Sequence, residues 1–226
     1  MPAPSSILYA NSQDGRVYQS DSNWATARDN TTGSSSSNSE HYSPFGIRAE
    51  ATAGRGGGTT YSVQRAFMFF DTSDIKTQVN SAKLNIYGHT NGGGDIIAVK
   101  SNSDITSLGT ADYDAIDGWD TSTGADGSGA GSQLGNITRY SNEFTTWNTG
   151  AYNQISLRGE ALNDMRTQNG LYVCLMNYDY DLLDIAPTGY TSNRNGLWFT
   201  DEENLNEDPK LVYTLDENSV HFGANF

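Results

Sequence analysis

The feature that most constrains the fold is an apolar run between Tyr61 and Asp71, with Phe67-Met68-Phe69-Phe70 at its centre. The run is far too short to cross a membrane as a helix, which takes about 20 apolar residues. Its central side chains do not alternate between apolar and polar, and such a strand is typically buried on both faces. We therefore predict that Tyr61–Asp71 is a central strand of a β-sandwich.

Shorter strand signals surround the central run and are separated by turn residues. In Phe45–Thr52, polar residues such as Arg48 and Glu50 alternate with apolar ones, which indicates a half-buried strand. The Asp14-Gly15 dipeptide between two strand-like runs predicts a hairpin. The remaining predicted strands are Ser6–Ala10, Arg16–Gln19, Ser81–Thr90, Asp95–Lys100, Tyr152–Leu157, Leu171–Asn177, Gly196–Thr200 and Lys210–Leu215.

Helix signals are scarce. Only Gly159–Gln168 predicts a helix, with Ala161, Leu162 and Met165 on one face. The segment Trp24–Tyr42 is predicted to be a loop, and the regular pattern is lost again from residue 101 to residue 141. Many short strands with one short helix predict an all-β chain, an antiparallel β-sandwich of jelly-roll type.

One domain is expected to span residues 1–215, because a chain of 226 residues suits a single β-sandwich and shows no clear boundary. Residues 216–226 are expected to form a tail. Its apolar residues Val220, Phe222 and Phe226 lie beyond the last predicted strand, so the tail either docks on a neighbouring subunit or frays.

The charge of the chain argues against some partners. The sequence has 13 Lys and Arg residues against 27 Asp and Glu residues, a formal net charge of −14. A surface of this sign repels nucleic-acid phosphates and anionic lipids, so we expect neither nucleic-acid binding nor membrane insertion. Strong acidity is typical of a soluble protein, and bound cations or basic partners are the alternative explanation.

The beginning of the chain and its one cysteine bear on location and reactivity. Met1–Tyr9 has neither the basic region nor the long apolar stretch of a signal peptide. We expect synthesis in the cytoplasm without a signal peptide, and a signal that was removed is the alternative. Cys174 lies in the apolar run Leu171–Met176, which favours a buried, unreactive thiol over a nucleophile.

The centre of the chain resembles a known family. Arg65–Ile75 is an Arg-led strand that ends in Phe-Asp-Thr-Ser, and Val79–Tyr87 continues with Ser-Ala-Lys-Leu-Asn-Ile-Tyr. Together they resemble the DNRLRE-type β-sandwich modules, which are jelly-roll domains related to carbohydrate-binding modules. Phe199–Glu203 and Asp208–Tyr213 are similar to the closing strands of that family. The resemblance implies a jelly-roll sandwich, and some modules of this kind carry a structural calcium ion.

A second resemblance concerns three stretches outside this central motif. Tyr87–Thr90, Asp95–Lys100 and Ala111–Ile116 look like segments of structural proteins in tailed phages. This resemblance implies a virion protein whose partners are capsid or tail subunits.

Catalytic motifs are missing from the sequence. It holds no Gly-x-Ser-x-Gly, no zinc spacing of Cys and His and no phosphate-binding loop, and its three histidines stand in unrelated contexts. Among 27 acidic residues, chance alone places two carboxylates at the separation that glycoside hydrolysis needs. We therefore assign no catalytic residue and expect no enzyme.

Three groups of acidic residues could supply the oxygen ligands of a calcium ion. No EF-hand loop is present, and acidic residues that alternate along a strand are more typical of a solvated face. We therefore assign no metal and no cofactor. The three groups are Asp112, Asp114 and Asp117; Asp179, Asp181 and Asp184; and Asp201, Glu202 and Glu203.

Aromatic residues in or near the polar loops are candidates for sugar binding, because an exposed ring stacks on a sugar while Asn and Asp bind its hydroxyl groups. The alternative is that these rings plug the ends of the sandwich. The residues that we assign to a carbohydrate site are Trp24, Trp119, Tyr178 and Tyr180, and Tyr190 is a fifth aromatic residue of this kind.

These observations predict a non-enzymatic structural protein on the virion surface of a tailed phage, either a capsid decoration protein or a fibre or appendage subunit. It is expected to form a homo-oligomer and to act by adhesion to virion proteins or to host surface glycans. The alternative is a carbohydrate-binding or adhesin module of a secreted bacterial protein. A polysaccharide-degrading enzyme is a third hypothesis, and it predicts a release of sugar that we do not expect.

Overall fold

The structure, a computed structural model, describes residues 5–40, 42–54, 56–103, 107–119, 136–189, 192–200 and 206–216. These residues form eleven strands and a few short helical segments. The strands are β1 (Ser5–Tyr9), β2 (Gly15–Asp21), β3 (Ser35–Ser37), β4 (Tyr42–Ala53), β5 (Thr59–Asp71), β6 (Val79–Asn91), β7 (Ile96–Lys100), β8 (Tyr152–Ser156), β9 (Gly170–Asn177), β10 (Arg194–Trp198) and β11 (Lys210–Leu215). The helical segments are α1 (Trp24–Asp29), the 3-10 turn η2 (Thr110–Asp112), α3 (Gly159–Thr167) and the π-helical turn η3 (Tyr178–Leu182).

The strands form two layers that share one long strand, β6. In the first layer β11 lies between β1 and β6, and β8 pairs with the other edge of β6. In the second layer β5 pairs with β2, β4 and β9, while β3 extends the sheet beyond β2 and β7 extends it beyond β9. The last residues of β6 pair with β10, which pairs with β4, so the sheet continues from one layer into the other.

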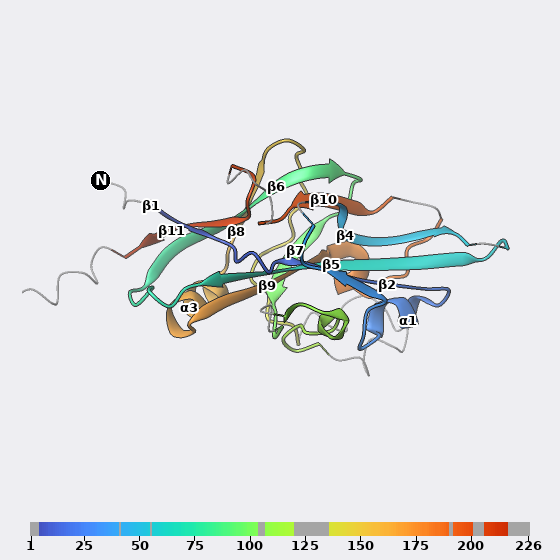
Figure 1. Ribbon diagram of the computed structural model, residues 1–226, viewed down its shortest axis with the longest axis horizontal. Coiled ribbons are helices and arrows are strands. Elements are labelled where there is room, and N and C mark those ends of the chain that lie inside the picture. The colour runs from blue at the N-terminus through green and yellow to red at the C-terminus, as the bar shows by residue number, and fades with distance from the viewer. Residues whose placement is uncertain are drawn as a thin grey trace, which may run out of the picture.

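The strand β5 changes its partner along its length. Residues 59–64 pair with β4 and residues 66–71 pair with β9 along the same edge, while β2 holds the other edge. Figure 1 shows β4 and β5 running together to one end of the molecule, with β1 and β11 at the opposite end. The sheet therefore divides near Arg65, where β4 leaves β5 to join β10.

The strands β5, β9 and β7 are buried on both faces. On one face, Met68 and Phe70 belong to the main core, which the first layer and α3 cover. On the other face, Phe67 and Cys174 belong to a second core that includes residues between 108 and 137. This confirms that the apolar run is a central strand, and it explains why apolar side chains occur there without alternation.

Most predicted strands are present close to their predicted bounds, and the pairings between them are antiparallel, so the fold is an all-β sandwich. The jelly-roll form of the sandwich stays a prediction. The predicted hairpin at Asp14-Gly15 is wrong, because β1 pairs with β11 while β2 pairs with β3 and β5. The chain does turn there, since the backbone N–H of Asp14 donates to the carbonyl of Asn11 at 3.0 Å, but the two strands diverge afterwards.

The predicted loop Trp24–Tyr42 is wrong in part. It contains α1, whose first turn is capped by the Asn23 side chain, which accepts a hydrogen bond from the backbone N–H of Thr26 at 3.1 Å. The segment also contains β3. It is therefore not a continuous loop, and α3 is not the only helix of the described residues. Of the tail, Asp216 is described and residues 217–226 lie outside the described residues, as does the long polar segment 120–135. The docking of the tail stays a prediction.

Candidate functional site

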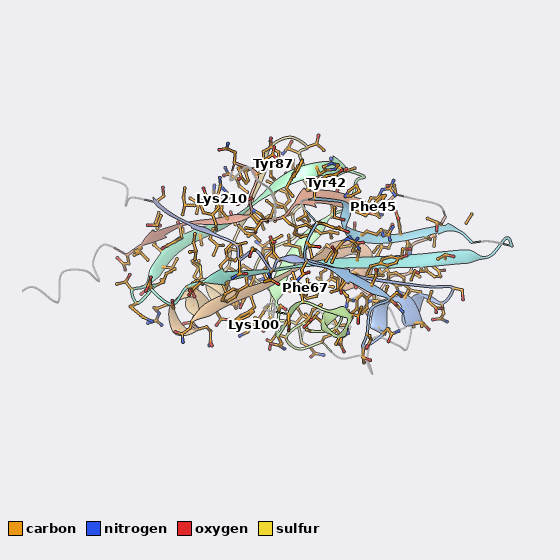
Figure 2. All side chains as sticks on the ribbon, viewed as in Figure 1. Tyr42, Phe45, Phe67, Tyr87, Lys100 and Lys210 are labelled. Carbon is orange, nitrogen blue, oxygen red and sulfur yellow. The ribbon has the colours of Figure 1, made fainter. Side chains whose placement is uncertain are left out.

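An open groove of about 540 Å³ lies over β2, β4 and β5. Aromatic rings, arginines and hydrogen-bonding side chains together form its walls. Figure 2 shows two of its residues, Tyr42 and Phe45, on the β4 side of the molecule, whereas Lys100 lies on the opposite side of the β5 ribbon in this view. We call it the Arg48 groove, and it is lined by Arg16, Tyr18, Glu40, Tyr42, Ser43, Pro44, Phe45, Arg48 and Gln64.

Strand register places the polar side chains of the groove in one row. Residues directly opposite each other in an antiparallel pair share one face of the sheet. Gln64 of β5 stands opposite Tyr18 of β2 and, on its other side, opposite Arg48 of β4. Arg48 in turn stands opposite Arg194 of β10. Four strands, of which only β4 and β5 are consecutive in the chain, therefore contribute to one polar face.

Arg48 is the central cation of the groove. Its Nη1 donates to Glu50 Oε1 at 3.1 Å, and its guanidinium carbon lies 4.6 Å from the ring centroid of Tyr18 and 5.2 Å from that of Phe45. The Nε of Arg48 is buried and has no hydrogen-bond partner among the described residues. A buried donor without an acceptor costs roughly 1–3 kcal/mol. Arg48 therefore keeps an unused donor in the wall of the groove.

An exposed aromatic stack stands at one end of the groove. The ring of Tyr42, which is 44% exposed, stacks on His89 with centroids 4.3 Å apart and planes at 7°. Trp198, opposite Tyr42 in the register, packs against it at 5.0 Å. The stack holds the Tyr42 ring in a fixed orientation at the surface.

Further polar groups of the groove are held by their neighbours. Arg16 donates through Nε to Glu40 at 2.7 Å, and the Gln64 amide donates to Ser43 Oγ at 3.2 Å. The Tyr18 hydroxyl lies 3.2 Å from Ser62 Oγ. Burial acts to raise the pKa of Tyr18, but hydrogen bonds with Ser20 and Ser62 and the charge of Arg48 together bring it below its ordinary value. These side chains offer both donors and acceptors to a ligand.

A second arginine assembly, the Arg65 cluster, lies in the interior on the face of β5 that carries the second core. We define it as Arg28, Asp29, Arg65, Asp181 and Asp184. Arg65 is fully buried and binds both oxygens of Asp181, through Nε at 2.8 Å and through Nη2 at 2.7 Å. Its Nη1 donates to the backbone carbonyl of Tyr113 at 2.7 Å, so each nitrogen of Arg65 has a partner.

The rest of the Arg65 cluster surrounds Arg28. Its Nε donates to the backbone carbonyl of Asp181 at 2.6 Å, its Nη1 pairs with Asp29, and Asp184 lies 3.5 Å from its Nε. Burial raises the pKa of Asp29 to about 6, against the lowering effect of the Arg28 charge. Two guanidinium groups thus face three carboxylates, and the raised pKa of Asp29 lets this carboxylate hold a proton close to neutral pH.

Three of the four aromatic residues assigned to a carbohydrate site pack against the second core, as the plugging alternative describes: Trp24, Trp119 and Tyr178. The Trp24 Nε1 donates to Asp184 Oδ1 at 3.0 Å. Trp119 lies over the guanidinium groups of Arg65 and Arg28, at 4.2 and 4.5 Å.

Tyr180, the fourth assigned aromatic residue, is partly buried in η3, and Tyr190 lies outside the described residues. The structure places the assigned residues around the Arg65 cluster rather than at the Arg48 groove. Their role in sugar binding stays a prediction.

The acidic groups considered for calcium are divided among different partners. Asp181 and Asp184 face arginines of the Arg65 cluster, and Asp117 accepts a hydrogen bond from the Thr138 hydroxyl at 2.6 Å. Residues 201–203 lie outside the described residues. The described members of these groups therefore bind other side chains, and their contacts do not favour a calcium site.

A different group of carboxylates could hold a cation. Asp95, Glu143 and Asp179 bring oxygen atoms within 4.8 Å of one another. Burial and the neighbouring negative charges raise the pKa of Glu143 and of Asp179. Only Asp179 belonged to an expected group, because the other two come from parts of the chain that are distant in sequence.

A smaller pocket, of about 280 Å³, lies beside β7 and α3. Lys100 Nζ at 3.0 Å and the Tyr140 hydroxyl at 2.7 Å both donate to Asp164 Oδ2. Burial and the Asp164 carboxylate raise the pKa of Tyr140, so the phenol stays protonated. The charged groups of this pocket are therefore engaged with one another.

The thiol of Cys174 is buried, and burial raises its pKa. The expected burial of Cys174 is therefore confirmed. A thiol that stays protonated and covered is a poor nucleophile.

The groove residues were not singled out from the sequence as a site. The alternation in Phe45–Thr52 did place Arg48 and Glu50 on one face, and the structure confirms that face. What was missing is the pairing that brings Tyr18, Gln64 and Arg194 beside Arg48. This pairing joins residues up to 146 positions apart, from Arg48 to Arg194, and has no local signal.

No protein-family model matches the chain, and no match was found among curated proteins. None of the helices that the structure describes has the length and apolar character needed to cross a membrane.

Proposed function

We propose that the protein is a non-enzymatic adhesion protein on the virion surface of a tailed phage, as a capsid decoration protein or a fibre or appendage subunit. The observation that carries the adhesion role is the Arg48 groove. It is open and shallow, presents aromatic rings and arginines, and holds a buried donor without a partner among the described residues. Its volume lies within the roughly 300–1,000 Å³ of ligand sites.

The outer edge of β1 supports subunit contacts. Within the described residues β1 pairs only with β11, and Ile7 and Tyr9 are 55% and 40% exposed. An exposed strand edge with apolar side chains is a template for pairing with another chain. The edge carries no charged residue, so it avoids the repulsion expected between copies of a chain of net charge −14.

The phage setting rests on the resemblance of Tyr87–Thr90, Asp95–Lys100 and Ala111–Ile116 to phage structural proteins. Two of these stretches lie in β6 and β7, which form parts of the sandwich, and His89 of the first stretch stacks on Tyr42 of the groove. The alternative, a carbohydrate-binding or adhesin module of a secreted bacterial protein, is favoured by the exposed Tyr42–His89 stack.

Sedimentation of the full chain tests the subunit contacts. We expect an oligomer at micromolar concentration, because the β1 edge pairs with a partner. Replacing Ile7→Lys puts a charge on this edge and is expected to give monomers with an unchanged melting temperature. Capsids of the phage that encodes the protein should bind the wild-type chain and not I7K. A chain that is monomeric at every concentration and does not bind capsids contradicts the virion proposal and leaves the secreted adhesin.

A further inference from the structure

The Arg48 groove, taken together with Arg194 and Glu50 beside it, carries a surplus of positive charge on an acidic protein. Arg48 and Arg194 share one carboxylate, that of Glu50, at 3.1 and 3.6 Å. Arg16 and Glu40 balance each other in the same groove. One guanidinium charge is therefore left over, although acidic residues outnumber basic ones by 27 to 13 in the whole chain. The groove thus favours an anionic ligand.

The contact between Arg65 and Asp181 illustrates how an arginine of this protein binds a carboxylate. The Nε and Nη2 of Arg65 form one edge of the guanidinium, and that edge binds both oxygens of the Asp181 carboxylate. Arg48 uses Nη1 for Glu50, and its Nε has no acceptor among the described residues. The fork geometry of arginine matches a carboxylate through two parallel hydrogen bonds. The corresponding edge of Arg48 is therefore suited to a carboxylate.

The surroundings of Arg48 are suited to a saccharide. The Tyr42 ring is exposed and held flat against His89, which gives a fixed surface for the apolar face of a sugar ring. Glu40 lines the same groove at a partly exposed position, and its carboxylate can accept a hydrogen bond from a sugar hydroxyl group in addition to its pairing with Arg16.

We propose that the Arg48 groove binds an acidic saccharide, with the carboxylate on the Nε side of Arg48 and a sugar ring against Tyr42. This inference rests on the proposed adhesion function and names its ligand. The Arg48 side chain is 14% exposed and its Nε is covered, so binding includes a small outward movement of the partly buried Phe45 ring that lies over it.

The test compares an oligosaccharide of hexuronic acid with a neutral hexose oligosaccharide of the same length, by calorimetry with the full chain at fixed salt. We expect the acidic oligosaccharide to bind at least 10-fold more tightly. Arg48→Gln keeps hydrogen-bonding groups but removes the charge, and is expected to abolish this preference. Arg166→Gln removes the same charge from an exposed residue of α3 and is the matched control, with no expected change.

The outcomes separate the two proposals. Equal binding of both oligosaccharides, lost in Tyr42→Ala, would overturn the acidic ligand and leave the adhesive groove. Binding of neither oligosaccharide would overturn the saccharide as ligand of the groove, while capsid binding that is lost in I7K would still support the virion proposal. An equal loss in R48Q and R166Q would show non-specific attraction and overturn the inference. The melting temperature of each variant shows whether the fold is intact.

Discussion

The Arg65 cluster and the Arg48 groove are built around arginines of neighbouring strands, yet they differ in the burial and hydrogen bonding of the arginine and in the balance of charge around it. Both arginines lie over aromatic rings and pair with a carboxylate. Arg65 is fully buried and each of its nitrogens has a partner, whereas Arg48 keeps a donor without one among the described residues.

The two assemblies also differ in their balance of charge. The cluster has three carboxylates for two guanidinium groups, while in the groove two guanidinium groups share Glu50. The surplus carboxylate is inside, where a proton can neutralise it, and the surplus cation is at the surface, where a ligand can. Arg28 Nη2 and Asp29 Oδ2 of the cluster also lack a hydrogen-bond partner among the described residues, as Arg48 Nε does, so the sign of the surplus charge is the clearer difference between the two assemblies.

The largest expected effect is on stability, from Arg65→Met. It leaves the Asp181 carboxylate buried without its main partner, and breaking a buried ion pair in this way costs about 3–5 kcal/mol. Arg48→Met, on the groove side of the comparison, should cost less, because Arg194 still faces the Glu50 carboxylate at 3.6 Å. Urea unfolding of the two variants measures both values. Similar losses for the two would end the distinction between the assemblies.

A smaller effect is expected for Trp119→Ala, which we expect to cost about 2–3 kcal/mol. Its ring packs on the second core and lies over Arg65 and Arg28, and a fully buried Trp costs about 3–5 kcal/mol when truncated. Tyr42→Ala should lower stability by less than about 1 kcal/mol and weaken ligand binding more. Thermal unfolding and saccharide titration of both variants provide the measurement. If W119A keeps its stability but loses saccharide binding, the sugar site lies at Trp119 and not in the groove.

The smallest effect is on the pH dependence, from Asp29→Asn. The folded-state pKa of Asp29, about 6, lies above its ordinary value of 3.8, so the folded protein holds this proton more tightly than the unfolded chain. The stabilisation is complete below pH 3.8 and is lost as the pH rises through about 6, which by linkage is about 1–2 kcal/mol after allowance for solvent screening. The stability of D29N relative to wild type should therefore rise over this range.

Denaturant unfolding of wild type and D29N at pH 4, 5, 6 and 7 measures this difference. Asp71→Asn is the matched variant, because hydrogen bonds with Ser73 lower the pKa of Asp71 instead of raising it. It should not produce a rise in relative stability over the same range. A constant difference between D29N and wild type would mean that Asp29 is ionised throughout.

The sequence predicted the strands well and their partners poorly. Phe67–Phe70 and Phe45–Thr52 carry their apolar pattern within a few residues, and both form strands. The expected faces of Phe45–Thr52 hold only in part, because Phe45 lies beside Arg48 in the groove and Glu50 is buried. The Asp14-Gly15 turn is equally local, but the partner of β1 is β11, about 200 residues away. Apolar patterning shows which face of a strand is buried and does not select its neighbour.

The same reason explains why the candidate site was missed. The aromatic residues in polar loops were assigned to sugar because loops are usually exposed. Trp119 covers two buried guanidinium groups, which the sequence does not show because Arg28 and Arg65 are 37 residues apart, and its role in sugar binding stays a prediction. The helix α1 was missed because it has only six residues, too few to show a repeating apolar pattern of helical period.

The strand β6 gives this sandwich a mechanical property. Its first residues are bonded to β11 and its last residues to β10, so one continuous backbone links both sheets. A pull on the β1 end of the molecule would be carried along this covalent chain toward the strands that border the groove, instead of across the side-chain packing between the layers. Separating the two layers would therefore require several backbone hydrogen bonds along β6 to break together.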